Sequence, residues 1–252
     1  MKNDQRHIKF KDGSILIAAH GIGWVALDKP CGISIHNDPG QDLSSVLKQY
    51  LEQDPDFSEE IQYDKTFGVN PVNRIDLETS GIVLFGVQKK TTAFFSGQFQ
   101  ERNVKKRYIA LVHGHPETGT SDQSWEMPLT PKAGGRKNPA GTGKKVNCIT
   151  QYHVLETSDH YSLIECEPYT GRKHQIRRHA KLNGTPITGD KKYGSPRSIR
   201  FLEENCSYSR LGLHSLSLSI TTPDGKEVII KSQVPEEFIR MIEGDKPLIE
   251  QV

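Results

Sequence analysis

Short runs rich in β-branched and aromatic residues recur along the chain, and they constrain its fold more than any other feature. Strands are expected at 15–19, 24–28, 81–87, 108–113, 149–155, 161–167, 213–220 and 227–231. Helices are expected at 42–53, where Asp42 is the N-cap, at 91–102, and at about 173–183, closed by Gly184. Many strands with few helices and no regular strand–helix–strand alternation indicate an α+β fold. Its core is a mixed, largely antiparallel sheet flanked by helices and loops.

Size and composition allow a single domain of residues 1–252. Of the 252 residues, 25% are charged and 34% hydrophobic, and a chain of this length buries roughly 70–75% of its unfolded surface. The four cysteines are far apart, which predicts neither a zinc site nor a disulfide framework. No apolar run approaches the ~18 residues of a membrane span, and the N-terminus lacks the apolar segment of a secretory signal. We therefore expect a cytoplasmic protein with no membrane association.

Charge is segregated along the chain although the net charge is only +2. No acidic residue occurs in 127–155 or 171–189, both of which carry several lysines and arginines, and a further basic group lies at 102–107. Acids concentrate at 52–64. Such a basic surface suits a polyanionic ligand, with ordinary solvated surface charge as the alternative. The irregular stretch 128–145 is expected to be a basic surface loop within one domain rather than a linker.

The segment 73–81 combines turn-forming residues with a charged pair. Asp, Thr, Ser and Gly before an apolar strand form hydrogen-bonded turns, which explains part of the pattern. Turn formation does not explain Arg74, which lies two residues before Asp76. A nearby cation keeps a carboxylate ionised where water is scarce, so Asp76 is a candidate functional acid.

Two further segments place basic residues beside possible ligand contacts. At 170–179 a basic helix start follows Gly171, although cations oppose the macrodipole at a helix N-terminus. Exposed N–H groups together with Arg172 favour a phosphate there. His174 and His179 are five residues apart, which does not suit a metal pair, so no metal site is expected.

At 105–112 a basic cluster runs into a strand, where Tyr108 could stack on a base.

These motifs together resemble those of RluA-type pseudouridine synthases. N-R-I-D-L-E-T-S-G at 73–81 is similar to their H-R-L-D-x-x-T-S-G. T-G-R-K-H-Q-I-R at 170–177 is similar to T-G-R-x-H-Q-I-R, and G-T-P-I-T-G-D-K-K-Y-G at 184–194 continues it. D-K-P-C-G-I-S-I-H at 28–36 resembles N-K-P-x-G-x-x-V-H, and L-H-S at 213–215 replaces L-H-A. The motifs follow the family order from about residue 24 to 238.

The resemblance implies the pseudouridine synthase catalytic fold and three catalytic residues. Asp76 matches the catalytic aspartate, Arg177 the arginine that pairs with it, and Tyr108 the tyrosine that stacks on the target base. The implied reaction breaks the N1–C1′ bond of uridine, joins C5 to C1′ and removes the C5 proton. It imports no group, so no cofactor is expected. The carboxylate has three possible roles: attack on C1′, attack on C6, or removal of a ribose proton.

The resemblance also implies RNA contacts. Arg74 matches the residue that enters the RNA stack when the uridine leaves it, and Asn73 stands where the family usually has His. Asparagine can form hydrogen bonds but cannot become cationic. Lys29, Arg172 and His174 complete the expected RNA-binding set.

The expected partner is rRNA or tRNA, and no protein partner is inferred. We expect no S4 domain before the first motif. The main alternative is a catalytically silent RNA-binding or assembly factor with the same fold, which tritium release in a single-turnover assay would distinguish. A third candidate function is a metal-dependent RNA hydrolase that uses the scattered histidines. Activity that is insensitive to EDTA would argue against it.

Overall fold

The computed structural model describes residues 6–118 and 123–246, and these residues form two compact units. The first unit contains the chain up to Lys106 together with Ser215–Ser232. The second contains Arg107–His214 and the segment from Gln233 onward. Each unit has its own antiparallel strands and its own apolar core.

The sheet of the first unit follows the order β1-β2-β3-β5-β10, with β11 beside β10 and β4 beside β5. These strands are β1 (His7–Phe10), β2 (Gly13–Gly21), β3 (Trp24–Lys29), β4 (Asn70–Pro71), β5 (Ser80–Gly86), β10 (Leu213–Thr221, in this unit from Ser215) and β11 (Glu227–Lys231). The pairs β1–β2, β2–β3, β3–β5, β4–β5 and β10–β11 are antiparallel. β3 and β5 at its centre are almost entirely buried, which positions the residues just before β5 on a rigid support.

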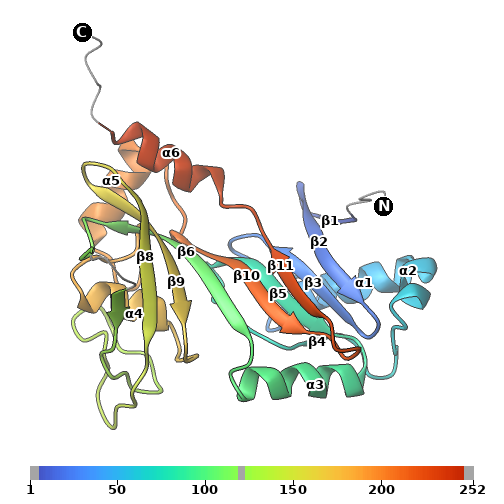
Figure 1. Ribbon diagram of the computed structural model, residues 1–252. Coiled ribbons are helices and arrows are strands. Elements are labelled where there is room, and N and C mark those ends of the chain that lie inside the picture. The colour runs from blue at the N-terminus through green and yellow to red at the C-terminus, as the bar shows by residue number, and fades with distance from the viewer. Residues whose placement is uncertain (1–5, 119–122, 247–252) are drawn as a thin grey trace. The chain divides into compact units, whose positions relative to one another are not determined.

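Both faces of this sheet are covered by helices. One face packs against α1 (Leu43–Gln53) and α2 (Pro55–Glu60), and the other packs against α3 (Lys89–Gln100), as Figure 1 shows. Successive side chains of a strand point to opposite faces. Val83 and Phe85 of β5 therefore join the α1–α2 core, whereas Ile82 and Leu84 join the core that contains Phe95 of α3.

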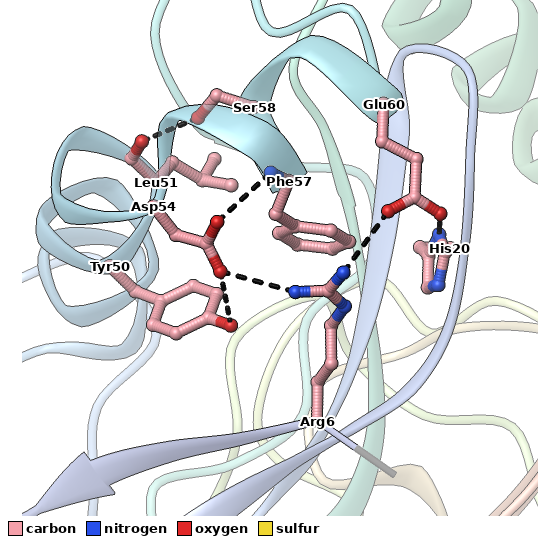
Figure 2. A network of polar contacts seen from close by, with 8 residues as sticks. All are labelled: Arg6, His20, Tyr50, Leu51, Asp54, Phe57, Ser58 and Glu60. Carbon is pink, nitrogen blue, oxygen red and sulfur yellow. Dashed lines mark hydrogen bonds and ion pairs between the residues drawn. The ribbon is translucent and has the colours of Figure 1, made fainter. Parts of the chain in front are cut away.

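A polar network fixes the chain before β1 to the corner between α1 and α2 (Figure 2). The guanidinium of Arg6 pairs with Asp54 at 3.1 Å and with Glu60 at 3.3 Å, and it lies 4.5 Å from the ring centroid of Phe57. Asp54 also accepts a hydrogen bond from the Tyr50 hydroxyl at 3.0 Å and caps α2 through the backbone N–H of Phe57 at 3.0 Å. Part of the acidic cluster in the sequence therefore stabilises the fold.

The sheet of the second unit follows the order β6-β9-β8-β7. Its strands are β6 (Lys105–His113, in this unit from Arg107), β7 (Gln123–Trp125), β8 (Thr150–Thr157) and β9 (Tyr161–Pro168), and all the pairs are antiparallel. The helices are α4 (Gln175–Leu182), α5 (Pro196–Asn205) and α6 (Glu236–Gly244). Ile176 and Ala180 of α4 pack into the core of this unit together with Ile164 of β9.

The structure confirms the α+β fold and every strand and helix expected from the sequence, with shifted ends. Asp42 caps α1 as predicted, because its carboxylate accepts the backbone N–H of Ser45 at 2.8 Å. The sequence pattern did not predict β1, β4, β7, α2, α5 and α6. Within the part of the chain that the structure describes, none of the helices has the length and apolar character that crossing a membrane requires.

Candidate active site

Asp76 lies in a loop whose backbone is fixed to β5. The backbone N–H of Val72 donates to the carbonyl of Leu84 at 2.8 Å, and the backbone N–H of Leu84 donates to the side-chain Oδ1 of Asn73 at 2.7 Å. The loop then turns back into β5, and the backbone N–H of Thr79 donates to the carbonyl of Asp76 at 3.1 Å. Asn73 therefore uses its amide oxygen to hold the start of the loop that carries Asp76.

The glycine that ends this motif is required by close packing. A Cβ on Gly81 would lie 2.2 Å from the carbonyl oxygen of Ser215 on β10, and the φ angle of Gly81 is +105°. Both conditions exclude an L side chain without rearrangement. Gly81 therefore fixes where the Asp76 loop enters the sheet.

Lys29 supports the same loop from inside the unit. Its side chain is 0% exposed, and its ammonium donates to the carbonyls of Pro30 at 3.0 Å, Ile33 at 2.9 Å and Leu77 at 2.9 Å. The carbonyl of Leu77 also accepts the backbone N–H of Gly32 at 3.0 Å. A buried ammonium with these partners has no surface to offer a nucleic acid, so the expected RNA contact of Lys29 does not fit the structure.

The side chains of this loop are less buried than its backbone anchors. Arg74 is exposed, Asp76 is half-buried and the Leu77 side chain is 53% exposed. The Asp76 carboxylate therefore lies between an exposed guanidinium, that of Arg74, and the exposed side chain of Leu77. The backbone that carries these side chains is held at several points. Such a site can present an acid to a large ligand without reorganising.

Arg177 on α4 forms a buried ion pair within the second unit. Its Nε and Nη2 donate to the two carboxylate oxygens of Asp190, each at 2.8 Å, and the two residues are 2% and 0% exposed. Asp190 also accepts the backbone N–H groups of Lys192 and Tyr193 at 2.9 Å. Asp190 was not predicted from the sequence as a partner of Arg177. An aspartate near the start of a G-D-x-x-Y-G turn nevertheless indicates a carboxylate that accepts backbone N–H groups.

The loop before α4 is closed by the side chain of Gln175. Its Oε1 accepts the Thr170 hydroxyl at 2.6 Å and the backbone N–H of Arg172 at 3.1 Å. His174 adopts a left-handed conformation, with φ of +54°, and its Nδ1 lies 3.0 Å from the Tyr193 hydroxyl. The helix therefore begins at Gln175, two residues later than predicted, because this side chain closes the preceding turn. Arg172 and His174 are half-buried.

Tyr108 lies on β6, half-buried, opposite Cys166 of β9. Part of its ring packs against the core of the second unit. Arg107 beside it lies 3.5 Å from Glu165 and 4.0 Å from Glu167, so carboxylates balance part of the basic group at 102–107.

The predicted site residues fall into two sets. Lys29, Asn73, Arg74 and Asp76 belong to the first unit, and their loop is held together by the contacts above. Tyr108, Arg172, His174 and Arg177 belong to the second unit. The pairing of Asp76 with Arg177 joins residues of different units and stays a prediction.

Comparison with known proteins gives consistent matches. A family model described as RNA pseudouridylate synthase matches residues 23–182. The tRNA pseudouridine synthase C of Haemophilus ducreyi is 30% identical over 232 residues, which cover 86% of this chain and 90% of that protein. The dual-specificity RNA pseudouridine synthase RluA of Salmonella typhimurium is 35% identical over 172 residues, covering 66% and 73%. The solved structure of human RNA pseudouridylate synthase domain containing 4 shares the fold, with a TM-score of 0.69 at 23% identity over 90% of this chain and 91% of that one.

Proposed function

The chain belongs to the RNA pseudouridylate synthase family, and we propose that Asp76 is the catalytic carboxylate with which it isomerises uridine to pseudouridine in RNA. The observation that carries the proposal is the Asp76 loop itself. Lys29, Asn73 and Gly32 hold its backbone, whereas the Asp76 carboxylate stays half-buried beside exposed side chains. A preorganised acid is what the reaction needs, because a reactive group held in place loses little rate to misorientation.

The chemistry requires Asp76 to be ionised. As an anion it can attack C1′ or C6 or remove a ribose proton, and each route lets the N1–C1′ bond break before C5 joins C1′. A nearby guanidinium favours the ionised carboxylate, and it stays protonated where a lysine could lose its proton. Arg177 is our candidate for this partner, with Asp190 holding its side chain in orientation.

The target uridine must leave its stack, at a cost of a few kcal/mol. Arg74 is the candidate to occupy the vacancy, because its side chain is exposed on the loop that carries Asp76. Tyr108 is the candidate to cover the face of the uracil and to relay the C5 proton. Arg172 and His174 complete the proposed RNA contacts.

We propose tRNA as the substrate class. A relative that is 30% identical across 90% of its own length is named for tRNA, and the dual-specificity relative is named for RNA more broadly. We also propose that both units form one catalytic domain, because the matched region, residues 23–182, includes residues of both. Action in the cytoplasm is part of the same proposal.

Tritium release from RNA labelled with 5-³H-uridine tests the function directly, because only replacement of the C5 proton liberates tritium. We expect release from a tRNA fraction and a smaller signal or none from rRNA. Release from rRNA alone would contradict the substrate proposal. If enzyme in excess over each RNA releases no tritium in a single turnover, the catalytic proposal fails and the silent binding factor is favoured.

Replacing Lys29 by methionine tests its role in holding the loop. The carbonyls of Pro30, Ile33 and Leu77 would each lose a buried donor. We expect a loss of about 3 kcal/mol of stability, or roughly 6–12 °C in Tm. We also expect kcat to fall about 10–100-fold, with a smaller change in KM for RNA, because a loosened loop misplaces the carboxylate.

The matched control is Lys48→Met, which removes an exposed lysine of α1. It should leave Tm within about 1–2 °C and kcat unchanged. A normal kcat for Lys29→Met, measured well below its lowered Tm, would show that this lysine stabilises the unit without positioning Asp76.

A further inference from the structure

The segment 128–147 of the second unit combines positive charge with exposure. It contains no acidic residue. The side chains of Lys132, Lys137, Lys144 and Lys145 are exposed, and Arg136 is half-buried. A loop of this charge can be either a flexible arm or a surface with one fixed conformation. The contacts within the loop show which of the two it is.

The backbone of this segment is internally bonded. Leu129 and Val146 exchange two backbone hydrogen bonds of 3.0 Å, and the backbone N–H of Thr130 donates to the carbonyl of Ala140 at 3.0 Å. Leu129, Ala140 and Cys148 form a small buried cluster, against which Leu182 of α4 packs. The segment therefore has its own core, which a flexible arm would lack.

Two glycines of the segment are required by close contacts. A Cβ on Gly134 would lie 2.0 Å from the carbonyl oxygen of Asn138. A Cβ on Gly141 would lie 2.0 Å from the Thr130 hydroxyl, and φ of Gly141 is +81°. Such contacts fit one fixed backbone path.

Arg178 of α4 holds the two halves of the segment together. It is 0% exposed, and its guanidinium forms five hydrogen bonds. The acceptors are the carbonyls of Pro139 at 2.6 Å, Thr130 at 3.0 Å, Ala140 at 2.7 Å and Lys173 at 3.2 Å, and the Thr130 hydroxyl at 3.2 Å. Burial lowers the pKa of Arg178, but a guanidinium stays protonated in proteins, so these are charge-assisted bonds.

His179 fixes the chain on either side of the same segment. Its Nε2 lies 3.0 Å from the carbonyl of Met127, and its Nδ1 lies 2.9 Å from the Thr150 hydroxyl. Burial lowers the pKa of His179, so the imidazole is neutral at pH 7. Because a carbonyl only accepts, Nε2 donates to Met127 and Nδ1 accepts from Thr150.

The segment also contacts the turn that carries the partner of Arg177. The Nη2 of Arg136 donates to the carbonyl of Lys191 at 3.1 Å, and Lys191 follows Asp190 directly. The basic segment is thus held by α4 on both of its flanks, through His179, and is joined to the Asp190 turn at Arg136. We propose that 128–147 is a preformed docking surface for the phosphate backbone of the RNA that flanks the target uridine, and that Arg178 is its positioning residue. The inference rests on the proposed function.

Charge removal tests the surface. In the double variant Lys144→Gln/Lys145→Gln, KM for the RNA that releases tritium should rise about tenfold at 0.15 M salt. The slope of log affinity against log salt should become shallower by about 1.4–1.8, the value for two lost phosphate contacts. The control, Lys48→Gln/Lys226→Gln, removes two lysines that lie beside Glu52 and Asp224. It should change KM less than twofold.

Arg178→Lys tests the positioning role. A single ammonium cannot reach all five acceptors, so the segment should open more often, and trypsin should cleave after Lys137 or Lys144 about ten times faster in the absence of RNA. KM should rise more than kcat falls, and saturating RNA should restore protection from trypsin. Faster cleavage with an unchanged KM would overturn the positioning role.

The two proposals fail in different ways. If the wild-type protein releases tritium while the lysine pair variant keeps the wild-type KM and salt slope, the docking surface is wrong and the proposed function stands. If the wild-type protein releases none from any RNA, the proposed function fails, and direct filter binding with the same variants still tests the surface. Should Arg178→Lys not fold, the lysine pair decides alone.

Discussion

Replacing Asp76 by asparagine is expected to lower the rate of tritium release by about 10⁴-fold or more, the loss typical when a residue that reacts with the substrate is removed. Asparagine has nearly the size and shape of aspartate, but it is neutral and cannot act as a nucleophile or a base. The backbone anchors of the loop involve the carbonyl of Asp76 and side chains of other residues, so they survive the change. RNA affinity should stay within a few-fold.

Glu78→Gln is the matched control, because it removes a carboxylate two residues away in the same turn. We expect its rate to stay within about fivefold of the wild-type rate, since its carboxylate has no proposed chemical role. Filter binding of the labelled RNA separates affinity from turnover for both variants. Undiminished release by Asp76→Asn would remove Asp76 from the mechanism, and equal losses in both variants would indicate disturbance of the turn.

The regular elements that the sequence predicted were those with long apolar patterns. Of the missed elements, β1, β4, β7 and α2 have six residues or fewer, whereas α5 and α6 have ten and nine. Helix α2 has six residues, too few to show helical spacing, although Asp54 and Pro55 mark its start. Helix α5 begins at Pro196 after Ser195, whose hydroxyl accepts the backbone N–H of Ser198 at 3.0 Å. Greater weight on cap residues would have identified both helices.

The candidate site was predictable where a motif is local and less so where partners are distant in the chain. Asp76 and Arg74 were found because two charges lie in one short turn. Lys29 was assigned to RNA because its motif resembles one of the family, whereas the carbonyls that surround it, including Leu77, meet only in the folded chain. The same limitation concealed the structural role of Arg178, which looked like one more cation of a basic helix.

Arg177→Lys is expected to lower kcat about 10²–10³-fold. Lysine keeps the positive charge but cannot form the two parallel bonds that Arg177 makes with Asp190. Its ammonium would therefore be free to move, and the charge that we propose as the partner of Asp76 would lose its fixed position. We also expect a stability loss of about 1–3 kcal/mol, because Asp190 stays buried with a poorer partner. The two backbone N–H groups that Asp190 accepts limit that loss.

Rate loss must be separated from stability loss, and Arg6→Lys provides the comparison. Arg6 is likewise an arginine paired with carboxylates, those of Asp54 and Glu60, but in a network at the surface of the first unit (Figure 2). Its replacement should lower Tm by a few degrees and leave turnover within about twofold. Both variants are assayed at least 15 °C below their Tm, with near-UV circular dichroism to confirm native packing. A near-normal kcat for Arg177→Lys would mean that any cation suffices at this position. The bidentate pair of Arg177 with Asp190 would then contribute to folding and not to the reaction.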